Sequence, residues 1–63
     1  MRNIESEIIS NKIRCRHCGD VIESLHVHDF KWCKCGKVAV DGGRHYLKRS
    51  GDLNGYDDLS EER

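Results

Sequence analysis

The residues of this chain best suited to chemistry are its four cysteines, which form two closely spaced pairs. Cys15 and Cys18 enclose two residues, Cys33 and Cys35 enclose one, and a glycine follows each pair. A turn of this kind presents two thiolates to one metal ion, and two such turns complete the tetrahedral four-sulfur set that Zn²⁺ accepts. The spacing therefore predicts a Zn²⁺ site formed by Cys15, Cys18, Cys33 and Cys35.

Three other interpretations of the cysteines stay open. The pairs could form disulfides, although a reducing compartment would argue against them. Cys15 and Cys18 could act in redox chemistry, with the intervening His17 lowering a thiol pKa. A mixed site is the third, because one residue between Cys33 and Cys35 is an unusual spacing. The ligand that replaces a cysteine would then be His17, His26 or His28.

No set of residues points to catalysis. His26 and His28 would share a face if they lie in a strand, and with Asp29 they could hold a second metal or a hydrolytic water. No further carboxylate or histidine cluster completes such a set, so we interpret these residues as the polar rim of a loop. Phosphate-binding glycine loops, zinc-protease helices and serine elbows are missing from the sequence. We therefore expect a protein that is not an enzyme.

The size of the chain favours a metal staple. Its 63 residues make one domain at most, and only 37% of them are hydrophobic. A core of this size is marginal without a disulfide, a metal or a partner chain. No apolar run is long enough to span a membrane, and the first residues lack the apolar stretch of a signal peptide. We expect a cytoplasmic protein that does not bind membranes.

The residues around the cysteines predict a small, mainly β, metal-stabilised fold that is similar to a zinc ribbon. Gly42-Gly43 suits a type I′ turn of a C-terminal β-hairpin, since both glycines tolerate positive φ. The expected strands are 20–25, an alternating stretch over 25–32, 37–41 and the returning strand 44–49.

The ends of the chain are expected to be accessory. Residues 1–11 would form an N-terminal arm, in which Asn3 caps a loose helical turn and the chain becomes extended by about Ser10. Residues 12–50 would form the zinc-ribbon-like domain. Residues 51–63 are polar and acidic, and we expect a loosely attached tail with at most one helical turn near Leu59.

Charge and aromatic residues leave two classes of partner open. The formal net charge is zero, but residues 12–49 carry nine basic and four acidic residues. This asymmetry supports a nucleic-acid-binding ribbon as the alternative function. The residues expected to contact nucleic acid are Arg14, Arg16, Lys31, Trp32, Lys34 and Lys37. Phe30 is expected in the core, whereas Trp32 could serve either the core or a stacking surface.

The central forty residues resemble an uncharacterised family of short proteins from Bacillus-type bacteria and their phages. The blocks that carry the resemblance are Cys15-Arg16-His17-Cys18-Gly19, His28-Asp29-Phe30-Lys31-Trp32-Cys33-Lys34-Cys35-Gly36 and Val40-Asp41-Gly42-Gly43. The resemblance implies a phage-encoded or prophage-encoded inhibitor or adaptor that binds a host protein, including a defence protein. We expect this protein-interaction role first. An edge strand near Tyr46 could also pair two copies into a homodimer.

Overall fold

The computed structural model describes residues 7–63, which form eight short β-strands and no helix. The strands are β1 (Ile8–Ser10), β2 (Lys12–Cys15), β3 (Val21–Glu23), β4 (Lys31–Trp32), β5 (Val38–Asp41), β6 (Lys48–Gly51), β7 (Tyr56–Asp58) and β8 (Glu61–Glu62). Nothing in this described part is a helix long and apolar enough to cross a membrane. The expected mainly β class is confirmed. The N-terminal helical turn capped by Asn3 lies outside the described residues.

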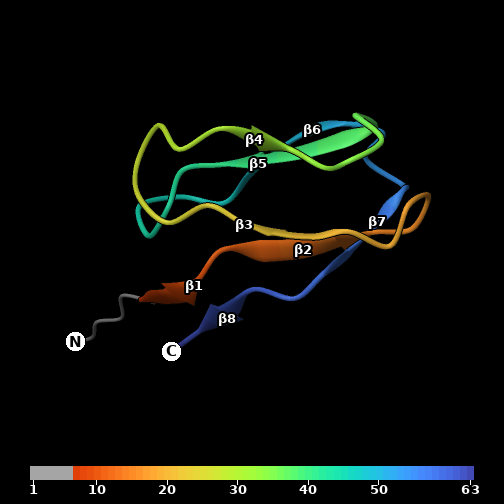
Figure 1. Ribbon diagram of the computed structural model, residues 1–63. Coiled ribbons are helices and arrows are strands. Elements are labelled where there is room, and N and C mark those ends of the chain that lie inside the picture. The colour runs from red at the N-terminus through yellow and green to blue at the C-terminus, as the bar shows by residue number, and fades with distance from the viewer. Residues whose placement is uncertain (1–6) are drawn as a thin grey trace.

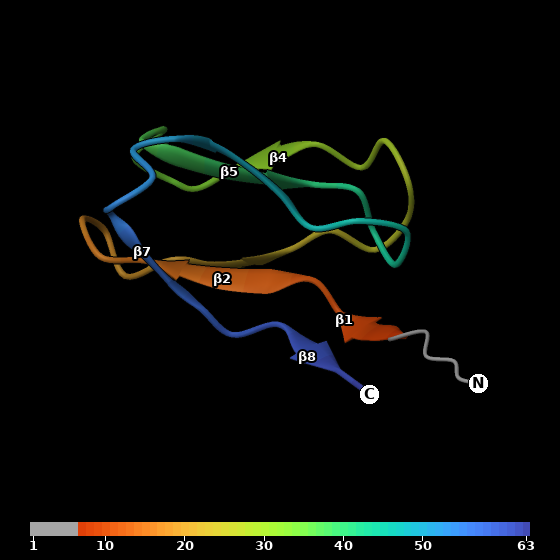
Figure 2. The same cartoon turned by 180° about the vertical axis from the view of Figure 1, so that it is seen from behind.

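Two antiparallel three-stranded sheets lie one above the other (Figure 1). One has the order β3-β2-β7 and the other the order β4-β5-β6. β1 and β8 form a separate two-stranded ribbon beyond one end of the first sheet, as the view from behind also shows (Figure 2). The turns that carry the cysteines lie at the opposite end of the two sheets.

A small core fills the space between the sheets. Ile13 on β2 and Val38 and Val40 on β5 are fully buried, while Arg14 on β2 is exposed. This alternation follows from the two-residue period of a strand, which directs every second side chain to one face. Cys15 and Cys33 also belong to the core cluster. Their sulfur atoms therefore extend the core beyond its apolar side chains, towards the turns that carry the cysteines.

Two buried polar side chains join the sheets at the other end. Asn11 has no exposed surface, and its amide nitrogen donates to the carbonyl oxygens of Asp41, Gly43 and Tyr46. The Ser24 hydroxyl donates to Asp29 O and accepts from the Gly43 backbone nitrogen. These bonds satisfy groups that would otherwise be costly to bury.

The expected C-terminal hairpin exists, but its returning strand begins later than predicted. β5 pairs with β6 from Asp41 opposite Lys48 to Val38 opposite Gly51. The connection is therefore the six residues 42–47 and not a two-residue Gly-Gly turn. The carbonyl of Gly42 accepts hydrogen bonds from His45 N and Tyr46 N, which winds the chain into a wider turn. Tyr46 itself lies in this turn, but the edge strand predicted near it is present as β6, which begins at Lys48 and is an outer strand of its sheet.

The alternating strand predicted over 25–32 is also wrong, since only its end, β4, is extended. Asp29 accepts a hydrogen bond from Leu25 N, and Ser24 binds the Asp29 carbonyl, so the segment closes into a compact turn. Phe30 leaves this turn 46% exposed and is not in the core, where Ile13, Val38 and Val40 already fill the space.

The C-terminal residues are not a loose tail. β7 pairs with β2 across Cys15–Tyr56, Arg14–Asp57 and Ile13–Asp58, and β8 pairs with β1. Tyr56 packs against the core cluster, and Arg49 lies over its ring. The expected helical turn near Leu59 is absent from these described residues, where Leu59 N donates to Lys12 O instead. The division of the chain at residues 11 and 50 stays a prediction.

Candidate metal centre

The first pair of cysteines lies in a tight turn between β2 and β3. Cys15 is the last residue of β2, and its backbone nitrogen donates to Asp20 O while Gly19 N donates to Cys15 O. The backbone nitrogens of His17 and Cys18 lie 3.3 Å and 3.5 Å from Cys15 Sγ. Gly19 has a φ of +77°, which glycine adopts without steric cost. This turn supplies the predicted knuckle with its predicted glycine.

The second pair lies in the matching turn between β4 and β5. Cys33 N donates to Val38 O, and Gly36 N donates back to Cys33 O, each at 2.9 Å. Gly36 has a φ of +74°, which almost equals that of Gly19. The shorter Cys33–Cys35 spacing therefore still yields a turn of the expected kind, with Cys33 buried and Cys35 exposed.

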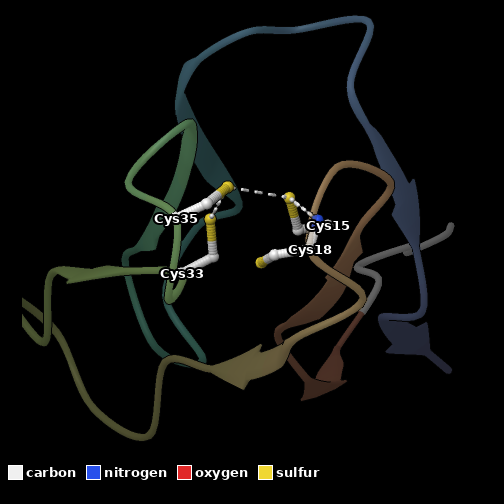
Figure 3. A group of neighbouring side chains, drawn as sticks. All are labelled: Cys15, Cys18, Cys33 and Cys35. Atoms are coloured by element: carbon white, nitrogen blue, oxygen red, sulfur yellow. Dashed lines mark hydrogen bonds between the residues drawn. The ribbon is translucent and has the colours of Figure 1, made fainter.

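The two turns direct all four sulfur atoms to one point (Figure 3). The four Sγ atoms lie within 4.8 Å of one another, with Cys15–Cys35 at 3.7 Å and Cys33–Cys35 at 3.6 Å. Four sulfurs at 2.3 Å from a tetrahedral Zn²⁺ would be roughly 3.8 Å apart. The cluster thus has the composition and nearly the spacing of a metal site. All four cysteines are free, at separations far above a disulfide bond of about 2.05 Å.

The thiols of the cluster differ in pKa. Burial opposes ionisation of Cys33, but hydrogen bonds from the Val38 and Lys37 backbone and from neighbouring thiols lower its pKa to about 6. Burial and hydrogen bonds with the other thiols raise the pKa of Cys35 to about 12. Four negative charges so close together are unfavourable without a cation, and a divalent metal removes that repulsion.

Histidines do not contribute to the cluster among the described residues. The Nε2 atom of His17 lies 2.8 Å from Asp52 Oδ2, and His26 Nδ1 lies 3.3 Å from the Val27 carbonyl. His28 lies in the compact turn with a φ of +69°. The grouping of metal-ligating side chains contains the four cysteines alone, which favours the four-sulfur site over the mixed one.

Sequence reasoning missed Asp20, which joins the two knuckles. Its Oδ2 atom accepts a hydrogen bond at 2.9 Å from the backbone nitrogen of Lys34, which lies between Cys33 and Cys35. Its own backbone also bonds to Cys15 in the first turn and helps to lower the pKa of Cys18. The only available signal was an aspartate directly after the first knuckle glycine, a residue that often caps turns.

The residues predicted to contact nucleic acid fall into two groups. Arg16 pairs with Asp57 at 2.7 Å, and Lys31 bonds to Glu23 O and lies 3.3 Å from Asp29. These two cations are thus already engaged. Among residues 7–63, the exposed cations of the predicted set without an ion pair are Arg14, Lys34 and Lys37. Trp32 is 48% exposed and therefore available.

Comparison with known proteins supports an uncharacterised family. No curated protein and no solved structure shows significant similarity to the chain. A family model described as "Domain of unknown function (DUF7695)" matches residues 7–51. The match includes both knuckles and β1 to β6, and it ends before β7. Because this match covers most of the chain, the protein belongs to the DUF7695 family of domains of unknown function.

Proposed function

We propose that the protein is a small binding module whose fold depends on one structural Zn²⁺ held by Cys15, Cys18, Cys33 and Cys35. The observation that carries the proposal is the convergence of four sulfurs from two facing sheets within 4.8 Å. Two buried and two more accessible thiols enclose the site, with no ligand position left for water or substrate. A closed four-cysteine set is typical of structural zinc, whereas catalytic zinc keeps an open position.

Zinc would supply stability where the sheets are otherwise weakly joined. Among residues 7–63, the buried apolar members of the core cluster other than the cysteines are Ile13, Val38 and Val40. A structural Zn²⁺ in a small domain contributes on the order of 10 kcal/mol of apparent binding free energy, which becomes folding free energy. The metal would thus replace the larger hydrophobic core that a chain of this length cannot form.

The role of the module is to bind another macromolecule and not to catalyse a reaction. The closed set of four cysteines and the hydrogen bonds that His17 and His26 make elsewhere support this view. A phage-encoded inhibitor of a host protein is what the sequence resemblance implies. A nucleic-acid-binding role has a separate structural support, the exposed Trp32 beside Phe30.

The metal proposal is tested by the metal content of untagged protein and by its Co²⁺-substituted form. We expect one zinc per chain. We also expect Co²⁺ to give the visible bands of a tetrahedral centre together with sulfur-to-cobalt charge-transfer absorption. A chain that folds without bound metal, or a cobalt spectrum that lacks the sulfur band, would refute the four-cysteine site.

A further inference from the structure

The outer face of the β4-β5-β6 sheet, which points away from the core, carries an aromatic pair. Trp32 pairs across the strands with Ala39, which in turn pairs with Ser50, so these residues share one face. Val38 and Val40 point to the opposite, buried face. Phe30 lies against Trp32 with ring centroids 5.5 Å apart and an interplanar angle of 81°. Both rings are close to half exposed, at 46% and 48%.

The Trp32 indole lies across the sheet and not beyond its edge. A Cβ atom placed on Gly51 of β6 would come 3.2 Å from Trp32 Cζ3, so the ring reaches over β5 to the far strand. Ala39 lies between them and is fully buried although it faces away from the core. Small residues at both positions therefore leave room for the ring, and 48% of Trp32 remains exposed to solvent.

Cations flank this aromatic surface. Lys48 pairs with Asp41, two residues after Ala39, so strand alternation places Lys48 on the same face as Ala39. Lys37 directly precedes β5. Lys34 lies in the adjacent knuckle. All three are exposed, and none makes an ion pair within residues 7–63. Asp41 is the one acid that the register places on this face, and its Oδ1 accepts from Gly42 N.

The acids of the C-terminal segment form their ion pairs with other cations, although Lys37 lies close enough to Asp52 to help lower the pKa of that carboxyl group. Asp57 pairs with Arg16, Asp58 with Arg49, and Asp52 with His17. The charges of Asp57 and Asp58 are thus balanced by arginines, whereas Asp52 bonds to His17, which is charged only when protonated. Although the formal net charge of the chain is zero, this face has exposed aromatic rings with lysines nearby that make no ion pair among the described residues.

We propose that this face, centred on Trp32 and Phe30 with Lys37 and Lys48, binds single-stranded nucleic acid. Unpaired bases would stack on the open side of the indole and on the phenyl ring, while the lysines contact phosphates. Aromatic rings on a flat surface accept any unpaired base, whereas the bases of a duplex are already stacked. The inference rests on the proposed function, because zinc holds the turn that connects β4 to β5.

The test uses Trp32 itself, since it is the only tryptophan in the chain. Zinc-loaded protein is titrated with a 12-nucleotide oligothymidylate and with a duplex of the same length, while indole fluorescence and the anisotropy of labelled DNA are followed. We expect the single strand to quench Trp32 and to bind more tightly than the duplex. Trp32→Ala should weaken binding about 5- to 150-fold, the loss expected for one stacked base.

Charge and position controls sharpen the test. The Lys37→Ala and Lys48→Ala substitutions should each reduce the slope of log affinity against log salt by roughly 0.7, the value for one phosphate contact to a single strand. Lys12→Ala, on β2 in the facing sheet, and Leu53→Ala, an exposed residue outside the strands, should leave quenching and affinity unchanged.

Several outcomes would overturn the proposal. Binding that survives Trp32→Ala, or equal affinity for the duplex, would mean simple charge attraction. A Trp32-dependent dimer in sedimentation with no quenching by either oligonucleotide would assign the face to a second copy of the chain. The zinc content of each sample separates the two proposals. A zinc-loaded chain that does not bind refutes this surface alone, whereas a folded zinc-free chain refutes the metal site.

Discussion

Cys15 and Cys35 occupy opposite environments within one sulfur cluster. Cys15 ends β2 with no exposed surface and belongs to the core, whereas Cys35 lies exposed in the shorter knuckle. The clustering of the four cysteines followed from their spacing and the glycine after each pair. Their unequal burial did not, because it depends on which sheet covers each turn. Asp20 escaped prediction for the same reason, since its partner Lys34 lies fourteen residues away in another turn.

This difference predicts unequal effects of serine substitution. Cys15→Ser would leave a hydroxyl buried in the core beside three thiolates, so we expect loss of stoichiometric zinc and of cooperative unfolding. Cys35→Ser would leave an exposed position that water can occupy, so we expect a folded protein with weaker zinc binding. Competition with a chromophoric chelator and a thermal melt measure both. Equal losses in the two variants would contradict the assigned burial.

Asp58 provides a residue-level prediction on pH. Partial burial opposes its ionisation, but hydrogen bonds from Ser60 and Arg49 lower its pKa below the ordinary value. A lowered folded-state pKa gives stability that is present above the ordinary pKa near 4 and is lost as pH falls through the folded-state value. Asp58→Asn should therefore flatten the acid side of the stability profile.

The size of the Asp58 effect is limited by solvent. The Asp58 side chain is 51% exposed although Arg49 is only 8% exposed, so we expect a loss of at most about 1 kcal/mol at pH 7. Urea melts of both proteins in the presence of zinc, from pH 7 down to the lowest pH at which the zinc stays bound, measure this loss, with Glu62→Gln as the exposed control. Parallel profiles for wild type and Asp58→Asn would contradict the prediction.

The turns between strands make buried contacts that stabilise the fold, although their sequences are polar. Gly43, in the 42–47 turn, has a φ of +54°, and a Cβ there would collide with the backbone of His26. Asn11 and Ser24 both bind the backbone of this residue. The sequence favoured a two-residue turn at this point because Gly-Gly is typical of one. The Asn11 contacts that stabilise the wider turn span more than thirty residues and leave no local pattern.

Two glycine substitutions distinguish the stability cost of backbone strain from the cost of a steric collision. Gly19 and Gly43 both have positive φ, but nothing lies within 4 Å of a Cβ on Gly19. Gly19→Ala should cost about 1 kcal/mol, the strain of a left-handed residue. Gly43→Ala adds the collision and should cost about 3 kcal/mol or more, within the range of severe single substitutions. Chemical denaturation of the zinc-bound variants measures both values, and a similar cost at the two sites would refute the close approach to His26.

Seen as a whole, the molecule consists of two thin sheets that are joined by sulfur atoms at one end and by Asn11 and Ser24 at the other. The sequence predicted the mainly β class, the hairpin of β5 and β6, and the cluster of four cysteines. It did not predict that β7 would pair with β2, because the segment after Gly51 has few apolar residues. The attachment of β7 depends instead on Tyr56 and on ion pairs with Arg16 and Arg49. The family match also ends at residue 51, so β7 lies outside the region that matches the family model.

The most direct test of a zinc-dependent fold is a thermal melt of the untagged, fully reduced protein with and without a strong chelator, after its zinc content has been measured. We predict one zinc per chain, and a cooperative unfolding transition that disappears with the chelator and returns when Zn²⁺ is added back. A fold that melts at the same temperature with and without the chelator would contradict the account, because the two sheets would then be stable without the metal.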